Sequence, residues 1–117
     1  MLKEIAGGVC APKGFKANGI HCGIRKNKIK KDLALIVSDV RCDTACVYTT
    51  NLVKGAPILV TQKNVADGYA QAVIVNSGNA NTCNEGGVHI AEDMCALVQA
   101  STGIPAGDVV IASTGVI

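Results

Sequence analysis

Two short segments of this sequence carry polar groups whose types and spacing could do chemistry. The first, at residues 76–81, reads Asn-Ser-Gly-Asn-Ala-Asn, which places the amides of Asn76, Asn79 and Asn81 beside one hydroxyl. Such a segment either binds a small ligand or uses its side chains to hold its own turns. It matches neither the phosphate-loop pattern nor the dinucleotide fingerprint. Both interpretations stay open from the residues alone.

The second segment is Ser113-Thr114-Gly115, which follows the apolar run at residues 109–112. A hydroxyl followed by a glycine N–H, at the carboxyl end of a buried strand, can direct two donors at one point, as an oxyanion hole requires. The same tripeptide is also common in plain turns, so by itself it does not distinguish an oxyanion hole from a plain turn. The two histidines, without a G-x-S-x-G pattern, give no plausible Ser-His-Asp triad.

The cysteines are the other residues with possible chemistry. A zinc site needs two close cysteine pairs, or one such pair with a histidine pair. Only Cys42 and Cys46 are close in sequence, and they lie in an apolar run that predicts a strand. We therefore predict no metal site and expect the thiols to be buried as small hydrophobic groups. The six are Cys10, Cys22, Cys42, Cys46, Cys83 and Cys95.

Composition predicts one folded domain over residues 1–117. Hydrophobic residues make up 49% and charged residues 17%, which is enough apolar surface for a core and argues against disorder. The net charge of +2 is too balanced to predict a nucleic-acid or membrane partner. The basic run at residues 25–31 is interpreted as a solvated loop.

Without an apolar leader or a stretch long enough to span a bilayer, we expect a cytoplasmic protein.

These candidate residues must be positioned by strands and at least one long helix. Apolar runs predict strands at residues 33–39, 45–50, 58–61, 72–76 and 109–113, with a turn at 40–44. Apolar residues at helical spacing predict a helix from about Val88 that stops at Gly103, and a weaker one is expected at residues 63–67. The fold class expected is mixed α/β (α+β). The apolar ending suggests that the chain is a piece of a longer protein.

Taken together, several segments resemble the N-terminal region of the ornithine acetyltransferase (glutamate N-acetyltransferase) family of arginine biosynthesis. They follow the family's order and cover nearly the whole chain. The most specific are Asn-Ser-Gly-Asn-Ala-Asn at residues 76–81 and Ser-Thr-Gly-Val-Ile at residues 113–117. The others lie at residues 8–17, 31–36, 49–51, 56–60 and 103–105.

The resemblance implies a precursor that cuts itself before a threonine, which becomes the N-terminal nucleophile of a second chain. That threonine takes acetyl from N-acetylornithine and passes it to glutamate by ping-pong transfer, without a cofactor. Some members also use acetyl-CoA as donor. The implied assembly is a heterotetramer of two alpha and two beta chains. The implied fold has layered sheets with outer helices, as in a self-cleaving N-terminal-nucleophile-like enzyme, and is incomplete here.

Two catalytic positions carry over from the family, and they are Thr114 and Gly115, which the resemblance assigns to the oxyanion hole. The nucleophile, the cleavage site and the main substrate-binding residues lie downstream in the family, so this chain alone should be inactive. The cysteines are more numerous than in the family. Two rival readings are a stand-alone domain that binds a small ligand through residues 76–81, and a metal or redox protein that uses the cysteines. A threonine after a small residue, downstream of Ile117, would favour the acetyltransferase.

Overall fold

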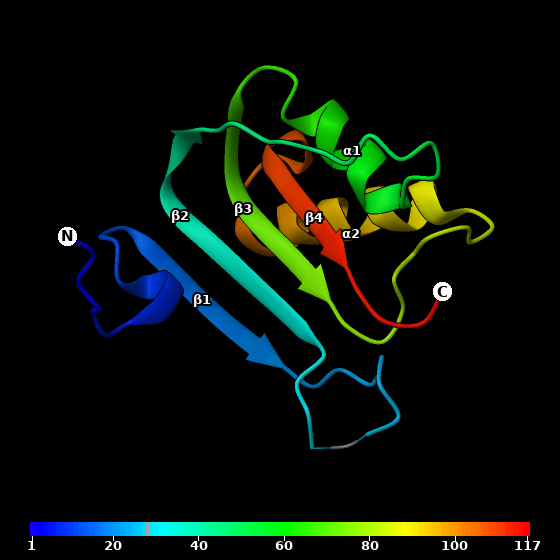
Figure 1. Cartoon of the computed structure of the whole chain (residues 1–117), viewed down its shortest axis with the longest axis horizontal. Coiled ribbons are helices and arrows are strands. Elements are labelled where there is room, and N and C mark those ends of the chain that lie inside the picture. The colour runs from blue at the N-terminus through cyan, green and yellow to red at the C-terminus, as the bar shows by residue number, and fades with distance from the viewer. Residues whose placement is uncertain (28) are drawn as a thin grey trace.

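A four-stranded sheet forms the centre of the structure, a computed structural model that describes residues 1–27 and 29–117. The strands are β1 (Phe15–Ile20), β2 (Leu33–Asp43), β3 (Tyr69–Asn76) and β4 (Val109–Ser113), and they lie in the order of the sequence (Figure 1). The pairs β1–β2 and β2–β3 are antiparallel, whereas β3–β4 is parallel. Lys28, which belongs to the basic run, lies outside the described residues.

Two α-helices cover one face of β3 and β4 (Figure 1). They are α1 (Ala56–Asn64) and α2 (Gly87–Thr102), and short 3₁₀ turns occur at Gly8–Cys10 and Ala106–Asp108. Alternate residues of β3 and β4 point toward the helices, which is the period expected of strands with one buried face. The core between these layers consists of Val60, Ala72, Ile74, Ala91, Cys95, Val98, Ile104, Val109 and Ile111. The mixed α/β class is therefore confirmed.

Helix α2 confirms the helical spacing seen in the sequence. Its buried stripe is formed by Ala91, Cys95 and Val98, together with Gly87 at its first turn. The helix ends where Gly103 adopts a left-handed conformation (φ 79°) and its N–H donates to the carbonyl of Gln99 at 2.9 Å. Glycine is preferred at this position because it has no Cβ to strain.

The strand predicted at residues 58–61 was wrong, because these residues form the middle of α1. The buried residues of α1 are Ala56, Pro57, Val60 and Thr61, and their spacing of four is helical. Pro57 lies in the first turn, where proline is favoured because its missing N–H has no helical partner. A short β-branched run cannot by itself distinguish a strand from a buried helical turn.

The strand predicted at residues 45–50 and the turn predicted at 40–44 were also wrong. Strand β2 continues to Asp43 through a register shift between Val37 and Cys42. Its partner β3 begins at Tyr69, so residues 45–50 have no strand to pair with and adopt no regular structure. The weak helix expected at 63–67 is only the end of α1 followed by a turn.

The sheet face turned away from the helices is also apolar. It consists of half-buried small and aliphatic side chains, called the open face below: Ala34, Ile36, Val73, Val75, Val110 and Ala112. No helix of the described residues lies over it.

Within residues 1–27 and 29–117, no helix is long and apolar enough to cross a membrane.

Candidate functional site

The parallel pairing of β3 and β4 brings the two polar segments found in the sequence to the same edge of the sheet (Figure 1). Beyond the strands, backbone hydrogen bonds keep the segments together. The N–H of Thr114 donates to the carbonyl of Asn76 at 3.0 Å, and that of Val116 to the carbonyl of Gly78 at 3.3 Å. The N–H of Ala80 donates back to Val116 at 2.9 Å. Residues far apart in the sequence therefore form one site.

Gly115 lies between these hydrogen-bonded residues in a conformation that requires glycine. Its φ is +126°, and a Cβ added to it would lie 2.5 Å from the carbonyl carbon of Gly78 and 2.8 Å from the nitrogen of Asn79. Neither the N–H of Gly115 nor the hydroxyl of Thr114 has a hydrogen-bond partner within the part of the chain that the structure describes. Two unpaired donors thus lie on adjacent exposed residues.

An open cavity of about 780 Å³ contains both residues. Its described lining carries two cationic side chains, those of Arg25 and Lys26, and no carboxylate. Such a cavity favours a negatively charged or oxyanionic group over a cation. The lining consists of Ile24, Arg25, Lys26, Asn27, Ser77, Gly78, Thr114, Gly115 and Val116.

Amide groups of Asn76, Asn79 and Asn81 hold the turns of this segment, and among them the buried Oδ1 atom of Asn81 has no hydrogen-bond partner within the described residues. The side-chain nitrogen of Asn76 donates to the carbonyl of Asn79 at 3.1 Å, and its oxygen accepts the Ser113 hydroxyl at 2.5 Å. The side-chain oxygen of Asn79 accepts the N–H of Asn81 at 2.7 Å, and the side-chain nitrogen of Asn81 donates to Gly87 at 2.8 Å. These contacts support the structural interpretation of the segment over the ligand-binding one.

Asp32 is a buried charge at this edge that sequence reasoning missed. Its side chain is fully buried and accepts the N–H of Cys22 at 2.7 Å and that of Arg25 at 2.9 Å, with the Nδ1 atom of His21 at 3.1 Å. Burial raises the pKa of this carboxyl, but the N–H donors of Arg25 and Cys22 outweigh burial and hold the pKa well below its ordinary value. Its only sequence signal is an acidic residue directly before a strand.

The prediction of buried cysteines was correct for Cys95 but wrong for Cys10, Cys22 and Cys83, which are exposed. The exposed thiols lie in loops or in the first 3₁₀ turn, where no layer covers them. All six thiols are free. Among the described residues, no group of three or more His, Cys, Asp and Glu side chains is close enough to hold a metal ion.

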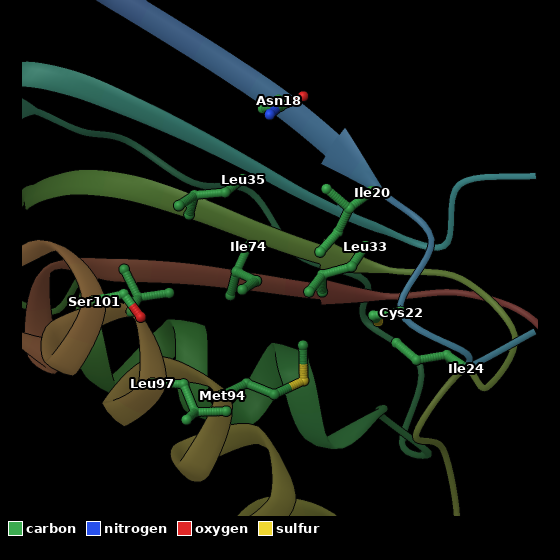
Figure 2. A pocket seen from close by; sticks show the side chains of 11 residues that line it. Asn18, Ile20, Cys22, Ile24, Leu33, Leu35, Ile74, Met94, Leu97 and Ser101 are labelled. Carbon is green, nitrogen blue, oxygen red and sulfur yellow. The ribbon is translucent and has the colours of Figure 1, made fainter.

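A second cavity, an apolar groove of about 530 Å³, lies between α2 and the strands β1 and β2. Figure 2 shows Leu33, Leu35 and Ile74 pointing from the sheet toward Met94 and Leu97 of α2. Asn18 and Ser101 add polar side chains at its rim, but no titratable cluster converges there. The described lining of the groove includes the Cys22 thiol but no charged side chain and no histidine that could serve as a general base. The cavity at Thr114 and Gly115, with its two unpaired donors and two cations, is therefore the candidate site.

The fold and this cavity define a mixed α/β domain with an electropositive donor site at the ends of two parallel strands. Comparison with known families gives a more specific assignment. The ArgJ family matches residues 16–117, and the chain belongs to that family.

Individual relatives agree with this assignment. The chain is 49% identical over 118 residues to the arginine biosynthesis bifunctional protein ArgJ of Symbiobacterium thermophilum, covering 99% of this chain and 29% of that protein. The crystal structure of the Bacillus halodurans protein of that name superposes with a TM-score of 0.88 at 45% identity, over 95% of this chain and 58% of the other. An ornithine acetyltransferase from Mycobacterium tuberculosis, complexed with ornithine, gives a TM-score of 0.83 at 38% identity, over 94% and 60% of the two chains.

The chain spans less than a third of the length of the curated relatives it matches and corresponds to an N-terminal portion of them. The recognition made from the sequence segments is therefore confirmed at the level of the family.

Proposed function

We propose that this chain is the leading part of the alpha chain of an ornithine acetyltransferase, in which Thr114 and Gly115 stabilise an oxyanion. The complete enzyme transfers acetyl from N-acetylornithine to glutamate and releases ornithine and N-acetylglutamate. The single observation that carries the proposal is the pair of unpaired donors, the Thr114 hydroxyl and the Gly115 N–H, on one cavity of an ArgJ-family fold.

The proposed reaction needs a nucleophile from outside this chain. The hydroxyl of a downstream threonine attacks the acetyl carbonyl carbon of N-acetylornithine, and its proton passes through the free α-amine of that threonine to the leaving amine. The carbon–nitrogen bond breaks, ornithine leaves, and an acetyl ester stays on the threonine. The amine of glutamate then attacks the ester and regenerates the hydroxyl. Each attack places negative charge on the carbonyl oxygen, which Thr114 and Gly115 stabilise.

The charge of the cavity supports substrates that carry carboxylates. Arg25 and Lys26 lie on its wall, and both N-acetylornithine and glutamate have an α-carboxylate. Positive side chains around a cavity raise the local concentration of anionic ligands. Glutamate, with two carboxylates, gains most from this field.

We further propose that residues 1–117 form one domain whose open face is covered by a second sheet, which gives layered sheets with outer helices. The beta chain of the same precursor is the expected partner, in an assembly of two alpha and two beta chains, located in the cytoplasm. An apolar sheet face of this kind is normally covered by another layer. The oxyanion pair would also assist self-cleavage, because that step passes through a similar tetrahedral intermediate.

The test of this function is Thr114→Ala in the complete, cleaved enzyme. The change removes one oxyanion donor and leaves the Gly115 N–H. We expect kcat for acetyl transfer to fall roughly 10²–10³-fold, or about 3–4 kcal/mol. KM should change much less, because the donor acts mainly in the transition state.

Thr114→Ser is the matched control, since it keeps a hydroxyl and should retain far more activity. Uncleaved precursor is removed before rates are compared, because cleavage itself depends on the same pair. A cleaved Thr114→Ala enzyme with near-normal kcat would show that Thr114 is only a turn residue. Replacing N-acetylornithine by acetyl-CoA in the same assay decides whether the second donor is used.

A further inference from the structure

Three segments of the chain lie close together at the candidate site. Gly78 lies in the middle, and Gly115 packs against one side of it, so closely that a Cβ on Gly115 would lie 2.5 Å from the Gly78 carbonyl carbon. A Cβ on Gly78 would in turn lie 3.0 Å from the Cγ2 atom of Ile24 and 3.1 Å from the Cγ atom of Arg25. The position of Gly115 is therefore bounded by Gly78, and that of Gly78 by the loop that contains Ile24 and Arg25.

Hydrogen bonds to the carboxylate of Asp32 hold that loop in place. Its carboxylate accepts the N–H groups of Cys22 and Arg25, which flank Ile24, at 2.7 and 2.9 Å. Its backbone links the loop to the polar segment after β3, because its carbonyl accepts the N–H of Ser77 at 2.9 Å. A fully buried carboxylate with several donors is a rigid anchor, since each hydrogen bond to a charged acceptor is stronger than one to a neutral group.

We propose that Asp32 is a positioning residue for the oxyanion pair, which it holds through Ile24 and Gly78 against Gly115. This inference rests on the proposed function of Thr114 and Gly115 and adds a residue that touches neither the substrate nor the reacting atoms. Catalytic donors lose effect steeply when they shift by less than an ångström. The buried carboxylate therefore acts on the rate by fixing where the Gly115 N–H lies.

The first experiment measures acetyl transfer by the complete enzyme with Asp32→Asn, which replaces one acceptor oxygen by a donor facing the N–H groups. We expect kcat to fall roughly 10- to 100-fold with a much smaller change in KM. Asp39→Asn is the matched control, because it makes the same chemical change on a half-exposed side chain of β2 and should leave kcat within about twofold.

A double variant separates positioning from a general loss of structure. If Asp32 acts through the oxyanion pair, Asp32→Asn and Thr114→Ala change donors that serve the same oxyanion, so their effects on kcat should be coupled and the double variant should depart clearly from the product of the two single losses. Additive losses would contradict the proposal. Ile24→Ala supplies a second route, because it removes the side-chain atom that lies closest to the Cβ position of Gly78 and leaves the buried carboxylate in place. It should lower kcat in the same direction, and an unchanged kcat would count against the contact between the three segments.

Amide hydrogen exchange tests this contact between the three segments independently of acetyl transfer. The N–H groups of Thr114 and Val116 donate to Asn76 and Gly78, so they should exchange faster in Asp32→Asn than in Asp39→Asn. Amides within β3 and β4 should exchange at the same rate in both. Unchanged exchange at residues 114–116 would overturn the proposal. A wild-type enzyme that transfers no acetyl would instead refute the proposed function and leave this measurement valid.

Discussion

At the scale of single residues, the proposed oxyanion site depends on a glycine as much as on a hydroxyl. Gly115 has a φ of +126° and approaches Gly78 more closely than any side chain would allow. Both Gly115 and Thr114 line the cavity of the candidate site. The conformational freedom of glycine is thus a requirement of the site itself.

Gly115→Ala should therefore disable the complete enzyme even though it keeps the N–H donor. The new methyl group meets backbone atoms, which cannot rotate away, and the left-handed φ adds about 1–3 kcal/mol of strain. We expect kcat to fall by roughly 10²-fold or more, with a lower Tm. Gly107→Ala is the control, because nothing lies within 4 Å of its added Cβ and its φ is ordinary. Equal kcat in the two variants would contradict this account.

Sequence reasoning proposed Thr114 and Gly115 as site residues but did not single out Asp32. The tripeptide alone fits a plain turn equally, and its proposed role came from the resemblance of the whole segment order to a known family. Asp32, by contrast, gains its role from donors seven and ten residues earlier in the chain, on a loop whose course no local pattern predicts. Burial of a charge can be recognised only when its partners are known.

At the scale of elements, an arginine ties together parts of the structure distant from the site. Arg41 of β2 donates to both carboxylate oxygens of Asp108 at 2.9 and 2.8 Å and to Asp67 at 2.6 Å. Its guanidinium also lies 4.5 Å from the ring centroid of Tyr69. These contacts raise the pKa of Arg41, with the hydrogen bonds to Asp108 contributing most. The network joins β2 and the start of β3 to the turn that leads into β4.

Arg41→Met should lower the Tm of the complete protein by several degrees. The change leaves the carboxylate of Asp108, which is 6% exposed, without its bidentate partner. Lys63→Met is the control, because the Lys63–Glu92 pair is largely exposed and exposed pairs contribute little. Thermal unfolding followed by circular dichroism measures both, and equal Tm values would argue against a structural role for the network.

The elements that could be predicted are those whose pattern is long or has a clear stop. The α2 helix and the strands at β3 and β4 fall in this group. Residues 58–61 fit a strand in the sequence because three apolar residues and a threonine match either period, and only packing on β4 decides for the helix. Strand β1, with Asn18 and Gly19 in its centre, is stabilised by pairing with β2 and has little intrinsic preference of its own.

At the scale of the whole molecule, the helices cover only one side of the sheet. The isolated 117-residue chain should therefore associate, because nothing in residues 1–27 and 29–117 forms a layer over the open face or pairs with the edge of β4. It should also show no acetyl transfer, since the proposed nucleophile lies elsewhere. Sedimentation velocity and an assay with N-acetylornithine and glutamate check both. A sharp monomer with cooperative unfolding, or measurable turnover, would contradict them.

The sequential strand order also has a consequence in time. Strands β1 to β3 can join by antiparallel pairing of neighbours, whereas β4 reaches β3 only after the intervening chain has formed α2 and crossed the sheet. Long connections and parallel pairing slow folding, so β4 is expected to be the last strand to dock. Thr114 and Gly115 follow directly after it. A precursor that cuts itself with the help of these two residues would therefore be cleaved only after the sheet is complete. Cleavage would then follow folding in time.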